Sequence, residues 1–222
     1  MSDFRVIDTL QPVTMMALQG SRQKLLLLAA GERAFALQGF DGVSLQSVAS
    51  DAGNRNKYAI QYHFKDKAGF LEAILRTRRS ELNRRRQQLI DTAIERGIAL
   101  ELPVLLEIQF APIAEQIGPN GETWFARLLF HLLTRLEPWS DIPLALGLDE
   151  PGNATIELWR LTNEKIAHLP AHQAQVRRSV AAWMVPGTLV DRENQIAAGQ
   201  QVAPIEVWLA DAIRMTAASL IC

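Results

Sequence analysis

A short polar stretch in the first third of the chain carries the side chains best suited to recognise another molecule. Over positions 54–64, NRNKYAIQYHF, hydrogen-bonding and aromatic residues surround a few small or apolar ones. Arginine and lysine bind phosphate oxygens, whereas arginine and glutamine also pair with the edges of guanine and adenine. These residue types at this spacing favour recognition of double-stranded DNA over catalysis.

Nine polar or aromatic side chains of this region are the expected DNA contacts: Ser44, Arg55, Asn56, Lys57, Tyr58, Gln61, Tyr62, His63 and Lys67. We assign the serine and the two lysines to phosphate oxygens, and Arg55, Tyr58 and Gln61 to base edges. Tyr62 and His63 either contact DNA or pack the helices together. The division of the turn residues between phosphate and base stays open.

Three short helices are expected to position these side chains. Apolar residues recur at helical spacing from Arg22 to Gln38, after which Gly39 ends the first helix. Ser44 caps a second helix that closes at Gly53, and the third helix covers Lys57 to Phe64. A short helix, a turn and a second short helix are typical of the helix-turn-helix, which places its second helix in the major groove.

A long fourth helix is expected to begin after Asp66, a favourable N-cap, and to end near Glu95. It would be about 40 Å long, since each helical residue adds about 1.5 Å. Six arginines lie along it: Arg76, Arg78, Arg79, Arg84, Arg85 and Arg86. We expect most of them to form a solvated face, although the cluster is also placed to touch DNA.

Proline and glycine set the boundaries expected for the remaining helices. These helices are 103–117, 122–136, 154–168, 171–185 and 204–221. The fourth of them ends at Pro186-Gly187, because proline interrupts helical hydrogen bonding. Few alternating β-type runs are present, so we expect an all-α protein.

Charge is divided unevenly along the chain. Residues 1–90 contain 14 Lys and Arg against 8 Asp and Glu, whereas residues 91–222 contain 9 against 16. The formal net charge of −1 therefore hides a basic front and an acidic back. Because the helix-turn-helix pattern lies in the basic part, this asymmetry favours a polyanionic partner.

The first helix followed by S-L-x-x-V-A-x-x-A-G and I-Q-Y-H-F-K-D-K-A-G-F-L resembles the tetracycline-repressor (TetR) family of transcriptional regulators. Twelve residues carry the resemblance in register: Phe35, Gly39, Ser44, Val48, Ala49, Ala52, Gly53, Tyr62, His63, Phe64, Lys67 and Leu71. The chain departs from the family pattern by one additional residue between Gly53 and Phe64. Gln61 stands where the family has an aromatic residue, so the family's phosphate-contacting tyrosine is not transferred to Tyr62.

The resemblance implies the organisation of the whole chain. It implies an N-terminal three-helix helix-turn-helix head joined by a long fourth helix to a C-terminal helical ligand-binding and dimerisation domain. The corresponding boundaries are a flexible N-terminal arm at 1–20, the DNA-binding domain at 21–68 and the regulatory and dimerisation domain at 69–222. It also implies a homodimer, joined through the last two long helices, that binds a near-palindromic operator and is a repressor released by a small organic effector. The apolar stripes on those two helices fit either a dimer seam or an intramolecular core.

Aromatic and polar residues of the second half are expected to surround the effector, since apolar walls with a few polar groups suit a small organic ligand. The expected lining residues are Phe110, Trp124, Phe125, Arg127, Phe130, His131 and Trp159. For any single ring, a core position is favoured over a place in the ligand site, whereas Arg127 and His131 fit the site and the surface equally well.

Catalysis and metal binding are not expected, and no cofactor is implied. The sequence contains no H-E-x-x-H, G-x-S-x-G or phosphate-loop pattern. His168 and His172 have the spacing of a helical zinc pair, but Pro170 between them should break that helix.

The single cysteine, Cys222, excludes an internal disulfide and fits a cytoplasmic location. No apolar run reaches the roughly 18–20 residues that a membrane span needs, so no membrane partner is expected. The alternative from another class is a helical interaction protein that has lost DNA binding.

Overall fold

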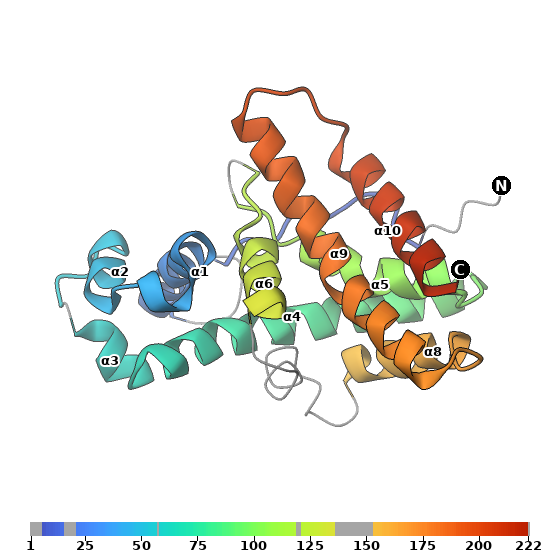
Figure 1. The fold of residues 1–222 in the computed structure, drawn as a ribbon. Helices are drawn as coiled ribbons and strands as arrows, with labels where there is room; N and C mark the ends of the chain where they lie inside the picture. The colour runs from blue at the N-terminus through green and yellow to red at the C-terminus, as the bar shows by residue number, and fades with distance from the viewer. Residues whose placement is uncertain (1–5, 16–20, 57, 119–120, 136–152, 222) are drawn as a thin grey trace.

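The computed structural model describes residues 6–15, 21–56, 58–118, 121–135 and 153–221. These residues form helices and connecting segments without any strand, which confirms the all-α fold class. The first three helices lie at one end of the molecule, and the long α4 connects them to the remaining helices (Figure 1). We call these three helices the head, and the second half of α4 with the helices that follow it the body.

The head consists of α1 (Arg22–Gly42), α2 (Leu45–Asp51) and α3 (Ala59–Phe64). Gly39 has φ 69° and interrupts α1 where the sequence predicts its end, although helical geometry resumes before Gly42. The α3 helix begins two residues later than predicted, since the Asn56 side chain accepts a hydrogen bond from the Tyr58 N–H and holds a turn there.

Phenylalanine rings form the core of the head. The ring of Phe70 lies 5.0 Å from that of Phe64 and 6.0 Å from that of Phe35. A Cβ atom at Gly31 would lie 2.3 Å from Cζ of Phe70, so the α1 backbone admits this ring only because position 31 is glycine. The packed rings fix α3 and the start of α4 (Lys67–Glu95) against α1.

The α4 helix has the predicted bounds, and the Asp66 carboxylate caps it by accepting from the Gly69 N–H at 2.7 Å. The predicted solvated arginine face is wrong. Arg78, Arg79 and Arg86 are buried, and Arg85 is largely covered by its ion pair with Glu115. These arginines lie on the sides of α4 that pack against α1, α5 and α8. Of the six arginines, Arg76 and Arg84 are exposed.

The body helices are α5 (Leu102–Ala114), α6 (Trp124–Arg135), α8 (Ala154–Lys165), α9 (Ala171–Ala197) and α10 (Ile205–Ile221). Every residue of α5 from Val104 to Ala114 is buried, so this helix is the centre of the body. The prediction that Pro186 ends α9 is wrong: the helix continues to Ala197. Proline removes one backbone hydrogen bond, but Pro186 is buried and the packing of α9 against α6 and α10 supports the helix on both sides of it.

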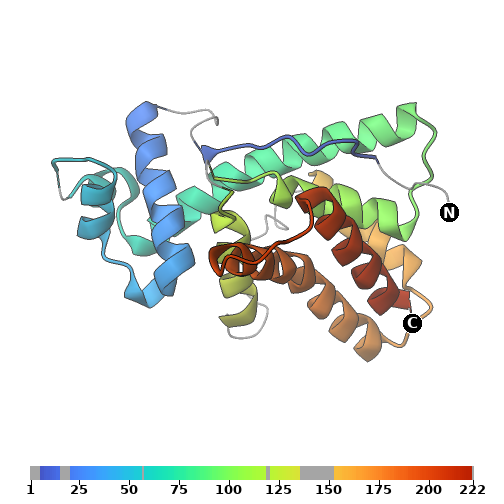
Figure 2. The same cartoon turned by 90° about the horizontal axis from the view of Figure 1, so that it is seen from above.

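Residues 6–15, which we call the N-terminal strap, pack on the body. The N–H groups of Val6 and Ile7 donate to the Glu107 carboxylate at 2.7 and 3.3 Å, and that of Val13 donates to the Glu115 carbonyl at 2.6 Å. In Figure 2 the strap, in dark blue, runs from the head side toward the far end of the body. The described part of the predicted flexible arm is therefore held in place.

Candidate functional site

The outward face of α3 carries the polar side chains that the sequence singles out. Gln61, Tyr62 and His63 are exposed, whereas Ile60 and Phe64 on the other face are buried in the head. Tyr62 is 83% exposed, and its ring meets that of His63 edge to face at 5.1 Å. A short helix that is anchored on one side and polar on the other has the form of a recognition helix.

Two side-chain hydrogen bonds hold the turn before α3. The Asn54 side-chain oxygen accepts from the Asn56 N–H, and the Asn56 side-chain oxygen accepts from the Tyr58 N–H, both at 2.9 Å. Arg55 between them is exposed and makes no hydrogen bond or ion pair with the described residues. The Arg55 guanidinium and the Tyr58 ring, 61% exposed, are thus available to a partner. Lys57, expected to contact phosphate, lies outside the described residues.

Ser44 and Lys67 both contact helix ends in the head. The Ser44 hydroxyl oxygen accepts from the Ser47 N–H at 3.4 Å and caps α2 at an exposed position. The Lys67 ammonium donates to the carbonyls of Phe40 and Asp41 at 3.1 and 3.3 Å. A cation at the end of a helix is favoured by the helix dipole, so Lys67 ties α4 to α1. Its assignment to phosphate stays a prediction, and its ammonium already has two acceptors.

A groove between α3 and the first half of α4 adjoins these residues. Four basic side chains line it: Lys24, Lys65, Arg76 and Arg84. The lining carboxylates of Glu72 and Glu81 pair with Arg79 and Arg84, respectively. Sequence reasoning did not assign Lys24 or Lys65 to the site; the basic excess of residues 1–90 was the available signal.

The region that contains this surface matches a known family. The family described as "Bacterial regulatory proteins, tetR family" matches residues 27–74, which run from α1 into α4 and include all of α3. Residues 27–74 belong to the TetR family. The match confirms the resemblance seen in the sequence and supports a DNA-binding transcriptional regulator, with the outward face of α3 inside the matched region. No curated protein matches the chain.

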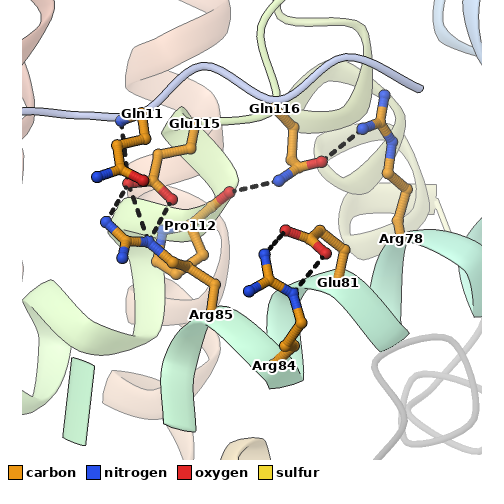
Figure 3. Close-up of polar contacts among 8 residues, drawn as sticks. All are labelled: Gln11, Arg78, Glu81, Arg84, Arg85, Pro112, Glu115 and Gln116. Atoms are coloured by element: carbon orange, nitrogen blue, oxygen red, sulfur yellow. Dashed lines mark hydrogen bonds and ion pairs between the residues drawn. The ribbon is translucent and has the colours of Figure 1, made fainter. Parts of the chain in front are cut away.

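Arg78 of α4 joins the head to the body. Its guanidinium donates to the Glu32 carboxylate of α1 at 2.6 and 2.7 Å, and to the side-chain oxygen of Gln116 at 2.5 Å. Figure 3 shows that the Gln116 amide donates in turn to the carbonyl of Pro112 in α5. The guanidinium also lies 5.6 Å from the ring centre of Phe125 in α6. Three helices and the segment that follows α5 therefore meet at one buried side chain.

A small cavity of about 30 Å³ lies in the body between α4, α5, α6, α8 and α9. It brings together Phe110, Phe125 and Trp159 of the seven residues expected to bind an effector. Sequence reasoning missed the cavity-lining Arg86 and Gln109. The spacing of Arg79, Leu82 and Arg86, which repeats every three or four residues, was the available signal, because such residues share one helix face.

The other four expected residues do not line this cavity. Trp124 lies beside Arg33 of α1, with 5.8 Å between the guanidinium and the ring. Arg127 bonds to Asn194 and approaches Glu193 at 3.4 Å. Phe130 packs closely on Gly187, and His131 is half-buried on α6. Their assignment to the effector stays a prediction.

None of the described helices is long and apolar enough to cross a membrane. Within the same residues, no group of three or more His, Cys, Asp and Glu side chains is placed to hold a metal ion. His168 and His172 are exposed and do not share a helix, since α9 begins after Pro170.

Proposed function

We propose that this TetR-family regulator is a homodimeric cytoplasmic repressor, without enzymatic activity, that a small organic effector releases from a near-palindromic operator. The observation that supports it most is the position of Arg78, which contacts both the head at Glu32 and the cavity-lining Phe125. A ligand that displaces the wall of the cavity thus acts on the group that sets the head on α4. The DNA-binding domain is proposed at 21–68 and the regulatory domain at 69–222.

The proposed DNA contacts follow the geometry of the head. Arg55, Tyr58 and Gln61 reach base edges from the turn and the outward face of α3, while Ser44 and Lys57 contact phosphates. Asn56, Tyr62 and His63 complete the surface, although the Asn56 side-chain oxygen already accepts one hydrogen bond from the Tyr58 N–H. A dimer presents two such heads, and therefore prefers two inverted half-sites about one or more DNA turns apart.

The dimer is proposed to form through α9 and α10. These adjacent helices expose several large apolar side chains: Val176, Trp183, Ile196, Val207, Met215 and Ile221. Large apolar groups gathered on an exposed face are typical of an interface. The same two helices run side by side along one face of the body in Figure 1.

Selection of genomic DNA fragments by the purified protein, followed by anisotropy with the retained fragment, tests this function. A repressor dimer retains fragments that share an inverted repeat, and its affinity falls steeply with salt because phosphate contacts release counterions. Retention of no common sequence would instead favour the helical interaction protein that does not bind DNA. A reporter gene placed behind the retained fragment separates repression from activation by the sign of its response.

A further inference from the structure

Arg86 of α4 is buried in the body and pairs with no carboxylate of the described residues. Its Nε and Nη2 donate to the Gln109 carbonyl at 3.1 and 2.7 Å, and its Nη1 donates to the Thr155 hydroxyl at 2.7 Å. The Thr155 hydroxyl donates onward to the Asn83 side chain at 2.5 Å. A guanidinium carries five N–H groups, so two remain for a further acceptor.

An unpaired buried charge is unfavourable, because protein groups replace water poorly around it. Burial lowers the pKa of Arg86 to about 9, which leaves the side chain charged at neutral pH. The other charged residue that lines the cavity, Arg79, pairs with Glu72. Among the described residues, the lining therefore offers positive charge and no negative charge, which is the environment that an anion stabilises.

Two neutral polar groups line the same cavity without a partner among the described residues. They are the side-chain oxygen of Gln109 and the indole nitrogen of Trp159. Gln109 is only 7% exposed, so bulk solvent has little access to its side-chain oxygen. An occupant that satisfies all three groups is an anion with a donor for Gln109 and an acceptor for Trp159. The remaining lining is apolar and includes the rings of Phe110 and Phe125.

We propose that this cavity binds a monocyclic aromatic carboxylate that carries a hydroxyl group, with the carboxylate on Arg86 and the hydroxyl donating to Gln109. The proposal rests on the proposed function, because it names the chemical class of the effector. The cavity, at about 30 Å³, is smaller than such a ligand. Binding of the ligand therefore pushes the walls of the cavity apart. Phe125 transmits this displacement to Arg78, because the Phe125 ring also faces the Arg78 guanidinium.

Calorimetric titration of the full-length protein with the three hydroxybenzoate isomers and the three matching hydroxybenzamides tests the ligand class. Acid and amide have nearly the same size and shape, so their comparison isolates the charge. We expect at least one acid to bind about tenfold or more tightly than its amide, since the ion pair with Arg86 forms away from water. Equal binding of each pair, or binding of neither at millimolar ligand, would overturn the proposal.

Two substitutions locate the interaction. Arg86→Gln should remove the preference for acid over amide, whereas Arg84→Gln, at an exposed position on the same helix, should preserve it. Gln109→Glu places a carboxylate beside Arg86 and should abolish acid binding while the protein stays folded. Acid binding by Gln109→Glu at the wild-type level would contradict the placement, even if the Arg86 variant fails to fold.

Anisotropy with operator DNA, measured with the same ligands, distinguishes failure of this inference from failure of the proposed function. Acid binding that leaves the DNA complex intact would support the ligand class and contradict effector-controlled release. Release of DNA by a neutral compound, with no acid bound, would support the proposed function and overturn the ligand class.

Discussion

Arg78 on α4 and Glu32 on α1 form a two-point ion pair, at 2.6 and 2.7 Å, whose side chains are each only 4% exposed. The pair lies where the head meets the body, and the third contact of Arg78 reaches Gln116, which follows the C-cap residue of α5. Because bidentate pairing fixes both distance and orientation, it sets the angle of the head on α4. In the function proposed above, this pair connects the cavity to the DNA-binding surface.

Removal of one partner of this pair should destabilise the protein strongly. Glu32→Gln leaves the Arg78 guanidinium buried with a neutral neighbour, which typically costs about 3–5 kcal/mol of unfolding free energy. Urea denaturation measures the loss. Glu81→Gln, which breaks the pair with the exposed Arg84, is the control and should cost about 1 kcal/mol or less. Similar losses of unfolding free energy in the two variants would show that the buried ion pair stabilises the protein no more than the exposed one.

Gln61 should set the preference at one base pair of the operator. Gln61→Ala removes a side chain that pairs with adenine, and should reduce discrimination at that position by about 1–3 kcal/mol. Competition binding with single-base operator variants measures this discrimination. Gln173→Ala, at an exposed position on α9, is the control. An unchanged preference at every base pair in Gln61→Ala would contradict this placement of α3.

Lys57 should contribute to affinity without contributing to sequence preference. Lys57→Ala removes one phosphate contact, so the slope of log affinity against log salt should become shallower by about one unit. Binding to operator and to unrelated DNA should weaken alike. Anisotropy over a series of salt concentrations gives the slope, and Lys165→Ala in the body provides the comparison. The same slope of log affinity against log salt in both variants would contradict the placement of Lys57 in the DNA interface.

Binding of an aromatic acid should weaken at high pH. The pKa of Arg86 in the free protein is about 9, so above that pH the cavity loses the positive charge that attracts the anion. Benzoate has no other titrating group in this range, and its affinity should be constant up to about pH 8 and then fall by up to tenfold per unit. Benzamide should show no such fall in calorimetry. Constant benzoate affinity up to about pH 10, with the protein still folded, would show that Arg86 is not the counter-ion.

Oligomeric state should depend on the apolar surface of α9 and α10. Trp183→Glu and Met215→Glu each place a charge on that surface, and burying a charge at an interface is unfavourable. Sedimentation velocity should show a dimer for the wild type and monomers for these variants. Gln173→Glu, on the same helix as Trp183, should remain dimeric. A monomeric wild type at working concentration would exclude this interface.

Local signals made the head predictable from sequence. Ser44 and Asp66 cap the helices that follow them through contacts within a few residues. Gly39 interrupts α1 through its own backbone conformation. Such contacts are visible as residue types at short spacing. The family match of residues 27–74 covers this same region. The outward face of α3 then follows from its neighbours, since Ile60 and Phe64 have to be buried.

Long-range contacts made the body harder to predict. The strap is held by Glu107, a carboxylate about a hundred positions away in sequence, whose backbone partners leave no pattern. Burial of Arg86 depends on Gln109 and Thr155 in two other helices. Pro186 reads as a helix end from its own chemistry, and only its packing inside the body shows that α9 continues. These features belong to tertiary structure and override local propensity.

The central claim is that the outward face of α3 enters a groove of DNA. It is tested most directly by anisotropy of a retained genomic fragment with wild-type protein and with a variant that carries Tyr58→Ala, Gln61→Ala and Tyr62→Ala together. These side chains are exposed, so the variant should keep its thermal unfolding temperature and lose its preference for the fragment over unrelated DNA. A folded variant that still selects the fragment as the wild type does would contradict the claim.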